Sequence, residues 1–255
     1  MSQTLTETLN HVANDHRKSV DTLRVFVEDV HADILGKAAD RDATAGFFMD
    51  HAVTPDVLKA VLNDSPSPDS GAGRRFADRI QELAYMQKKF PGLLLEMAFI
   101  YRVALFDAFI PDLIRLLLIG LPQMLKSKKQ LSHQEILEQG EFNSLIGLMA
   151  DKELQDFGYG SIKEQSRWVH DHLGLDLFSS KTQLDQVTEL TARRNLFVHA
   201  NGCVDRSYLT AASQGEENLG RRLDVHASYW GECDRCLTEV SDRLLDGILS
   251  KFCAP

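Results

Sequence analysis

The chain has 255 residues, of which 44% are hydrophobic and 25% are charged, and its formal net charge is −9. This composition is ordinary for a globular protein with one large domain or two small ones. The negative charge argues against broad, tight binding to nucleic-acid backbones, which requires a basic face, but it leaves room for a local basic site.

No export or membrane signal stands out. Residues 1–20 are polar and mixed in charge, so we expect no secretory signal peptide. The most apolar region, Leu93–Leu121, contains too many charged residues for a membrane span. We therefore expect a cytoplasmic protein without membrane contact, whose four cysteines are free thiols.

Residues 4–35 are predicted to form one long amphipathic helix that ends at Gly36. His16 fills a gap in its narrow apolar stripe. Such a stripe suits a helix packed on its own domain or, alternatively, a coiled-coil seam that binds a partner or a second copy. The stripe consists of Leu5, Leu9, Val12, Val20, Leu23, Val27, Val30 and Ile34.

A linker-like segment follows. Thr54-Pro55 is predicted to start a short helix that reaches residue 62, and residues 63–73 are rich in Pro, Ser and Gly. We expect a surface loop or domain boundary there. The resulting division is an N-terminal helical region, 1–75, and a helical domain, 76–255.

The next segment is the most apolar of the chain. Residues 74–90 are predicted to form a helix that Pro91-Gly92 ends. Residues 93–110 are apolar nearly all round, which predicts a central buried helix. Glu96 and Arg102 within it are costly to bury unpaired, so we expect them to pair in the core or, alternatively, to line a cleft.

Shorter helices are predicted after this point. Lys126, Lys128 and Lys129 form the densest basic run, which is either a solvated turn or a contact for phosphates. Ser132 and Ser161 are each followed three residues later by Glu, which predicts two capping boxes that open helices.

The C-terminal part completes an all-helical pattern. Residues 182–200 and 224–252 show helical periodicity, and residues 203–209 are predicted to be extended. No alternating strand pattern occurs, so the fold class is predicted to be mainly α.

The helix over 182–200 carries the most informative motif. Arg194, Asn195 and His199 lie near its end, and Asn201-Gly202 can adopt the positive φ that ends a helix. A cation, an amide and an imidazole can together perform acid–base chemistry on a phosphate. Arg-x4-His pairs also occur elsewhere in the chain, so the Asn and the helix end carry the specificity.

Helical geometry separates the two charged members of the motif. Arg194 and His199 are about 140° apart around the axis and roughly 7.5 Å apart along it. They can flank a groove, with the Arg side chain reaching around, or converge if the helix unwinds at His199. The alternative interpretation is that Arg194 is a surface cation and that His199 caps the C-terminal end of the helix.

Arg194-Asn195-x-x-x-His199 resembles the R-(N/D/H)-x-x-x-H signature of the HEPN superfamily. The surrounding run, residues 193–202 with Val204 and Tyr208-Leu209, is similar to one of its bacterial branches. The likeness extends more loosely over residues 90–250. It implies a HEPN-like helical bundle with an additional N-terminal helical region, and a homodimer in which the motifs of two chains line one cleft.

The resemblance also implies a function. Many members are metal-independent endoribonucleases of toxin–antitoxin or antiviral defence systems, with RNA as substrate, no cofactor, and an antitoxin or other protein as partner. His199 would act as general acid or base, Arg194 would stabilise the charge on phosphorus, and Asn195 would orient either group. Arg193 and the lysines at 126, 128 and 129 would bind RNA. The alternative function is a non-catalytic helical interaction module.

Metal chemistry is not favoured by the sequence. Cys233-x-x-Cys236 supplies half of a zinc site, but both cysteines lie on an apolar helical pattern that is typical of buried thiols. We therefore expect no metal.

Overall fold

The computed structural model describes residues 2–50, 71–125 and 131–253, with side chains for 4–36, 89–125, 131–155 and 157–253. The predicted basic residues Lys126, Lys128 and Lys129 lie outside the described residues. So does the short helix expected over 54–62.

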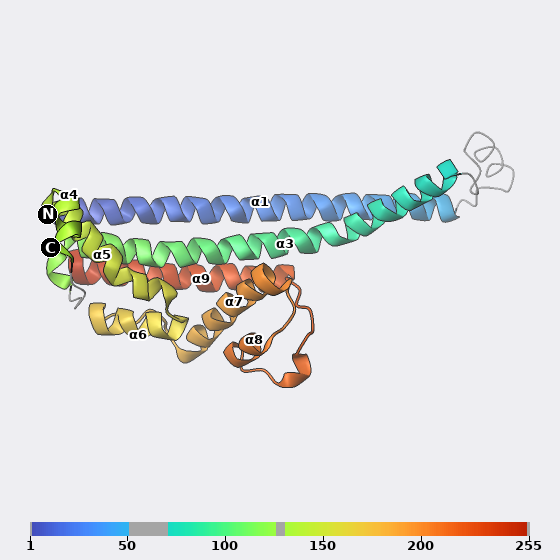
Figure 1. Ribbon diagram of the computed structural model, residues 1–255. Helices are drawn as coiled ribbons and strands as arrows, with labels where there is room; N and C mark the ends of the chain where they lie inside the picture. The colour runs from blue at the N-terminus through green and yellow to red at the C-terminus, as the bar shows by residue number, and fades with distance from the viewer. Residues whose placement is uncertain (1, 51–70, 126–130, 254–255) are drawn as a thin grey trace. The chain divides into compact units, whose positions relative to one another are not determined.

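The described residues are helical, apart from short connections and an isolated bridge between Cys203 and Arg222. This confirms the prediction of a mainly α fold. The helices are α1 (Ser2–Asp50), α3 (Gly71–Gly120), α4 (His133–Gln139), α5 (Phe142–Tyr159), α6 (Ile162–Leu173), α7 (Lys181–Ala200), α8 (Arg206–Ala211) and α9 (Ala227–Ile248), with 3-10 turns at Pro122–Met124 and Glu216–Asn218 and a π-turn at Leu249–Cys253 (Figure 1).

Packing divides the chain into two compact units. One comprises Met1–Leu23 and Ala98–Pro255 and is called the bundle unit below; the other is Arg24–Met97. The division falls within α1 and α3, so each of these helices contributes to both units. The boundary expected near residue 75 stays a prediction, because most of the Pro/Ser/Gly-rich run lies outside the described residues.

α1 buries the predicted apolar stripe inside the protein. Leu5, Leu9 and Val20 are buried in the bundle unit, together with Ala13 in place of the predicted Val12. The end of α3 approaches so closely that a Cβ on Gly120 would lie 2.6 Å from the Leu5 side chain. The stripe is therefore a packing face of its own fold, as the first of the two interpretations predicted.

Three predicted helix boundaries are wrong. α1 continues past Gly36 to Asp50, and α3 begins at Gly71 and continues through Pro91. An interior glycine costs a helix only about 1 kcal/mol and an interior proline about 3 kcal/mol. Burial of apolar side chains such as Leu95 and Phe99 further along α3 offsets a penalty of that size.

Two other expectations need correction. The segment 203–209 is not extended throughout, because α8 begins at Arg206, where the Asp205 side chain caps the helix by accepting from the Tyr208 N–H. The helix over 93–110 is not buried all round, since Met97 is 61% exposed. The capping boxes at Ser132 and Ser161 are both confirmed.

The contact between α1 and α3 includes His16, the histidine that the sequence places in the gap of the apolar stripe. His16 stacks on Phe109 of α3, with ring centroids 3.9 Å apart, and its Nε2 is buried without a hydrogen-bond partner among the described residues. Burial, followed by the positive charge of Arg102, lowers the pKa of His16 to about 4. A neutral imidazole therefore belongs to this contact at physiological pH.

Arg102 is fully buried and ties α3 to α9. Its Nε donates to the Asp234 carboxylate at 2.7 Å, and one terminal nitrogen donates to the Thr238 hydroxyl at 3.1 Å. The other terminal nitrogen, Nη1, has no partner among the described residues. This confirms, for Arg102, the expectation of pairing within the core.

We predict that Arg102→Met lowers the free energy of unfolding by about 3–5 kcal/mol, because it removes the guanidinium that is ion-paired with the buried Asp234 carboxylate. Adding Asp234→Leu removes that charge and should recover most of the loss. Arg115→Met is the matched control, since Arg115 pairs with Asp151 at the surface, and it should cost less than about 1 kcal/mol. Equal losses in all three variants, measured by urea unfolding, would contradict this account.

Candidate functional site

The motif helix α7 lies in the bundle unit, where it contacts α6, α8 and α9 (Figure 1). The Ser180 side chain caps its start by accepting from the Gln183 N–H. Its end is the predicted one: Asn201 and Gly202 have φ values of 51° and 74°, and the Gly202 N–H donates to the Leu196 carbonyl at 3.0 Å. The helix does not unwind at His199.

His199 and Asn195 line one pocket beside α7. Its volume is about 320 Å³, and its walls come from α7, from the start of α6 and from α8. Both side chains are exposed, and neither makes a hydrogen bond or ion pair within the part of the chain that the structure describes. The imidazole is therefore accessible to a molecule bound in the pocket.

Arg194 points away from this pocket. One of its terminal nitrogens is ion-paired with the Asp107 carboxylate of α3, and its Nε is buried without a partner among the described residues. Burial raises the pKa of Asp107, and the Arg194 charge opposes that effect. Arg194 and His199 thus face different surroundings, as their spacing along a regular helix requires.

Arg193 is part of a hydrogen-bonded network centred on Glu189. One Glu189 oxygen accepts from Arg193 Nε at 2.7 Å and from the Tyr208 hydroxyl at 2.6 Å. The other accepts from the Tyr229 hydroxyl at 2.6 Å. The Arg193 guanidinium also lies 4.0 Å above the Tyr229 ring, and its side chain is only 14% exposed. In this structure Arg193 joins helices rather than presenting itself to a phosphate.

The network perturbs the tyrosines it contains. Burial, together with the hydrogen bond to Glu189 and that group's charge, raises the pKa of Tyr208 to about 12. Burial and then Glu189 raise the pKa of Tyr229 still further. Both phenols therefore remain protonated donors, which is what three bonds to one carboxylate require.

Asp107 and Glu189 were not found from the sequence. Glu189 lies four residues before Arg193, a spacing that favours an ion pair on one helix face, so that signal was present. Asp107 lies 87 residues from Arg194 and had no local signal.

The chain after α7 folds back beside the motif. Gly202 and Val204 exchange backbone hydrogen bonds with residues 220–223, and Cys203 bridges to Arg222. A side chain at Gly202 would collide with Phe197, whose ring edge lies 2.9 Å from the position of a Cβ. Phe197 in turn packs edge-on against Phe99 of α3, with ring centroids 5.9 Å apart, so α7 also contacts α3.

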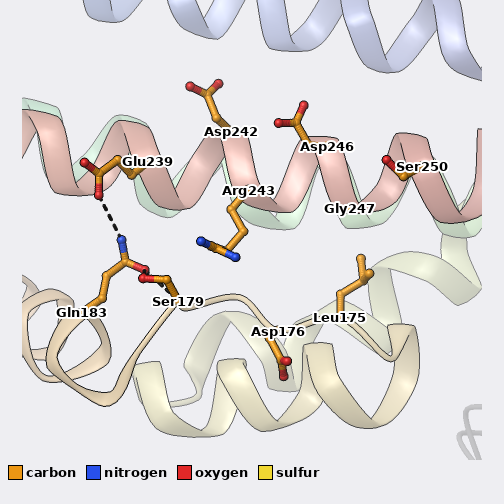
Figure 2. A pocket seen from close by; sticks show the side chains of 10 residues that line it. All are labelled: Leu175, Asp176, Ser179, Gln183, Glu239, Asp242, Arg243, Asp246, Gly247 and Ser250. Atoms are coloured by element: carbon orange, nitrogen blue, oxygen red, sulfur yellow. Dashed lines mark hydrogen bonds between the residues drawn. The ribbon is translucent and has the colours of Figure 1, made fainter.

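A larger pocket, of about 740 Å³, lies between α9 and the segment 175–183 and contains no motif residue (Figure 2). Its side chains include one arginine, Arg243, and four carboxylates, of which Asp242 and Asp246 leave α9 on the side opposite to Arg243. The carboxylates are Asp176, Glu239, Asp242 and Asp246. That charge disfavours a phosphate ligand.

The cysteines form no metal site among the described residues, and these contain no cluster of potential ligands. Cys233 and Cys236 are buried in α9, and burial raises the pKa of both thiols, that of Cys236 to about 11. They are packing residues, as the apolar pattern predicted.

Comparisons of this chain with protein-family models, curated proteins and solved structures find no match. Within the described ranges, no helix has the length and apolar character that a membrane span requires.

We predict that Glu189→Ala lowers the free energy of unfolding by about 2–4 kcal/mol, because it leaves a mostly buried guanidinium and two phenols without their acceptor. Glu232→Ala, on the exposed face of α9, is the control and should change stability by less than about 0.5 kcal/mol. Chemical denaturation of both variants tests this. A wild-type value for Glu189→Ala would show that the network does not hold the three helices together.

Proposed function

We propose that the chain is a metal-independent endoribonuclease of the HEPN type, acting in toxin–antitoxin or antiviral defence. The observation that carries the proposal is the pocket in which His199 and Asn195 are both exposed and make no hydrogen bond or ion pair with other described residues. The motif resemblance supplies the reaction class, and the free imidazole is the group that such a reaction needs.

The reaction begins with attack of the ribose 2′-oxygen on the adjacent phosphorus. The O2′–P bond forms, the P–O5′ bond breaks, the 2′-hydroxyl loses its proton and the departing 5′-oxygen gains one. The products are a 2′,3′-cyclic phosphate and a 5′-hydroxyl end. His199 serves one of the two proton transfers, and Asn195 orients the imidazole or the phosphate.

Arg194 constrains how the site is completed. Within one chain it is paired with Asp107 and does not line the His199 pocket. A homodimer in which the cleft of one chain receives the motif of the other would supply a second imidazole and a guanidinium for the phosphorane charge. Each chain has a net charge of −9 and therefore few cations to hold a phosphate. In the dimer, two copies of each motif cation would lie in one place.

We predict that purified protein cleaves RNA in EDTA and that His199→Ala lowers the rate at least 100-fold, the usual contribution of a general acid or base. Arg194→Ala should cause a comparable loss and Asn195→Ala a smaller one. End-group analysis should find the cyclic phosphate.

His226→Ala is the matched control, because His226 is an exposed histidine that does not line the pocket, and its activity should stay within about twofold of wild type. Activity that survives His199→Ala but disappears in EDTA would refute the mechanism.

A second prediction concerns the shared cleft. If two chains build each active site, mixing wild-type protein with an excess of His199→Ala protein should lower activity more than dilution does. Proportional loss after subunit exchange, or full activity of a monomer in sedimentation experiments, would rule out the shared cleft.

A non-catalytic interaction module is the second candidate, and one surface favours it. Phe90, Leu93 and Met97 recur at helical spacing on α3 in the unit Arg24–Met97, and all three are exposed. A row of large exposed apolar side chains is typical of a protein-binding surface. Absence of cleavage together with loss of partner binding in Met97→Glu would favour the module over the nuclease.

A further inference from the structure

The pocket beside His199 is lined by a row of polar side chains and by a group of apolar side chains. The polar residues are Thr188, Thr191, Asn195 and His199, which follow one another at spacings of three and four and so share a face of α7, together with Ser207 of α8. The apolar residues are Ile162, Ala192, Leu196, Ala200 and Ala211.

The charges near the pocket disfavour a phosphate inside it. No lysine or arginine among the described residues lines it, whereas Asp205 does. A second carboxylate, that of Glu164, accepts hydrogen bonds from the backbone and hydroxyl of the lining residue Ser161. A phosphate needs cations or free N–H donors, and here the start of α6 is already capped by its own side chains.

One lining group lacks the partner that its burial calls for. The Thr191 hydroxyl is buried and makes no hydrogen bond within the described residues. The Thr188 hydroxyl, by contrast, donates to the Leu184 carbonyl at 2.7 Å. The Thr191 oxygen is closed off from solvent, so a molecule in the pocket would reach the exposed side chains of Asn195, His199 and Ser207 instead.

We propose that this pocket binds a single nucleobase of single-stranded RNA. The inference rests on the proposed ribonuclease function and deepens it by assigning base recognition to a defined wall of α7. A base has a flat apolar face for the alanines and Leu196, and donors and acceptors along its edge for the exposed side chains of Asn195 and Ser207. A volume of about 320 Å³ is at the small end of ligand sites, which suits one nucleoside.

The arrangement also connects recognition to chemistry. His199 is the last member of the polar row, so a base held against Asn195 brings its own ribose to the imidazole. The phosphate then lies outside the pocket, where the cations of the proposed second chain can reach it.

Ala211→Leu tests the inference, because Ala211 lines the pocket and a leucine there would fill it. The matched control is Ala227→Leu, at an exposed position at the start of α9. We would titrate adenosine, guanosine, cytidine and uridine separately into the full-length protein and follow amide NMR shifts. Wild type and Ala227→Leu should bind one or two of these nucleosides saturably, and Ala211→Leu should bind them at least tenfold more weakly.

Ser207→Ala removes one exposed hydroxyl of the lining, so it should weaken binding of the preferred nucleoside by about three- to tenfold, as expected for one hydrogen bond. The same variants are then assayed for cleavage of RNA oligonucleotides that differ in one base. If wild type binds no nucleoside, or if Ala211→Leu binds as well as wild type, the inference is wrong.

The two proposals fail separately. Nucleoside binding that depends on Ala211, without any RNA cleavage, would support base binding in the pocket and contradict the ribonuclease proposal. RNA cleavage that shows no base preference and is unchanged in Ala211→Leu would contradict base binding in the pocket and leave the ribonuclease proposal standing.

Discussion

The carboxylate of Glu189 is the interaction on which the candidate site depends. It accepts from Arg193 of its own helix, from Tyr208 of α8 and from Tyr229 of α9, so one side chain joins three helices. α7 and α8 are two of the walls of the His199 pocket. Because α8 is a six-residue helix on a long connection, its position relies on this bond and on the buried cluster of Leu196, Val204, Tyr208 and Leu209.

The regular geometry of α7 explains why the adjacent residues Arg193 and Arg194 have different partners. A regular helix turns about 100° per residue, so Arg193 and Arg194 point to different neighbours. Arg193 meets Glu189 and the Tyr229 ring, Arg194 meets Asp107, and His199 faces the pocket. A motif that is contiguous in sequence is thus divided among three environments, and only Asn195 and His199 share one of them.

Much of the fold could be predicted from local signals. Local spacing was sufficient to predict the capping boxes, the helix end at Asn201-Gly202 and the apolar stripe of α1, because each depends on residues only a few positions apart. Helix continuity through Gly36 and Pro91 could not be predicted in this way, because it depends on whether packing outweighs a local penalty. The partners of Arg102 and Arg194 had no sequence signal, since Asp234 and Asp107 come from distant helices.

The distribution of charge limits what the pocket can do alone. The chain is acidic overall, the larger pocket is lined mainly by carboxylates, and the His199 pocket lacks lysine and arginine. A phosphate ligand would therefore need cations from outside that pocket, and Arg194 can supply one only from a different side of α7. The proposed arrangement, with a neutral base in the pocket and a phosphate between two chains, is consistent with both facts, because each part of the nucleotide would then meet the environment that its charge requires.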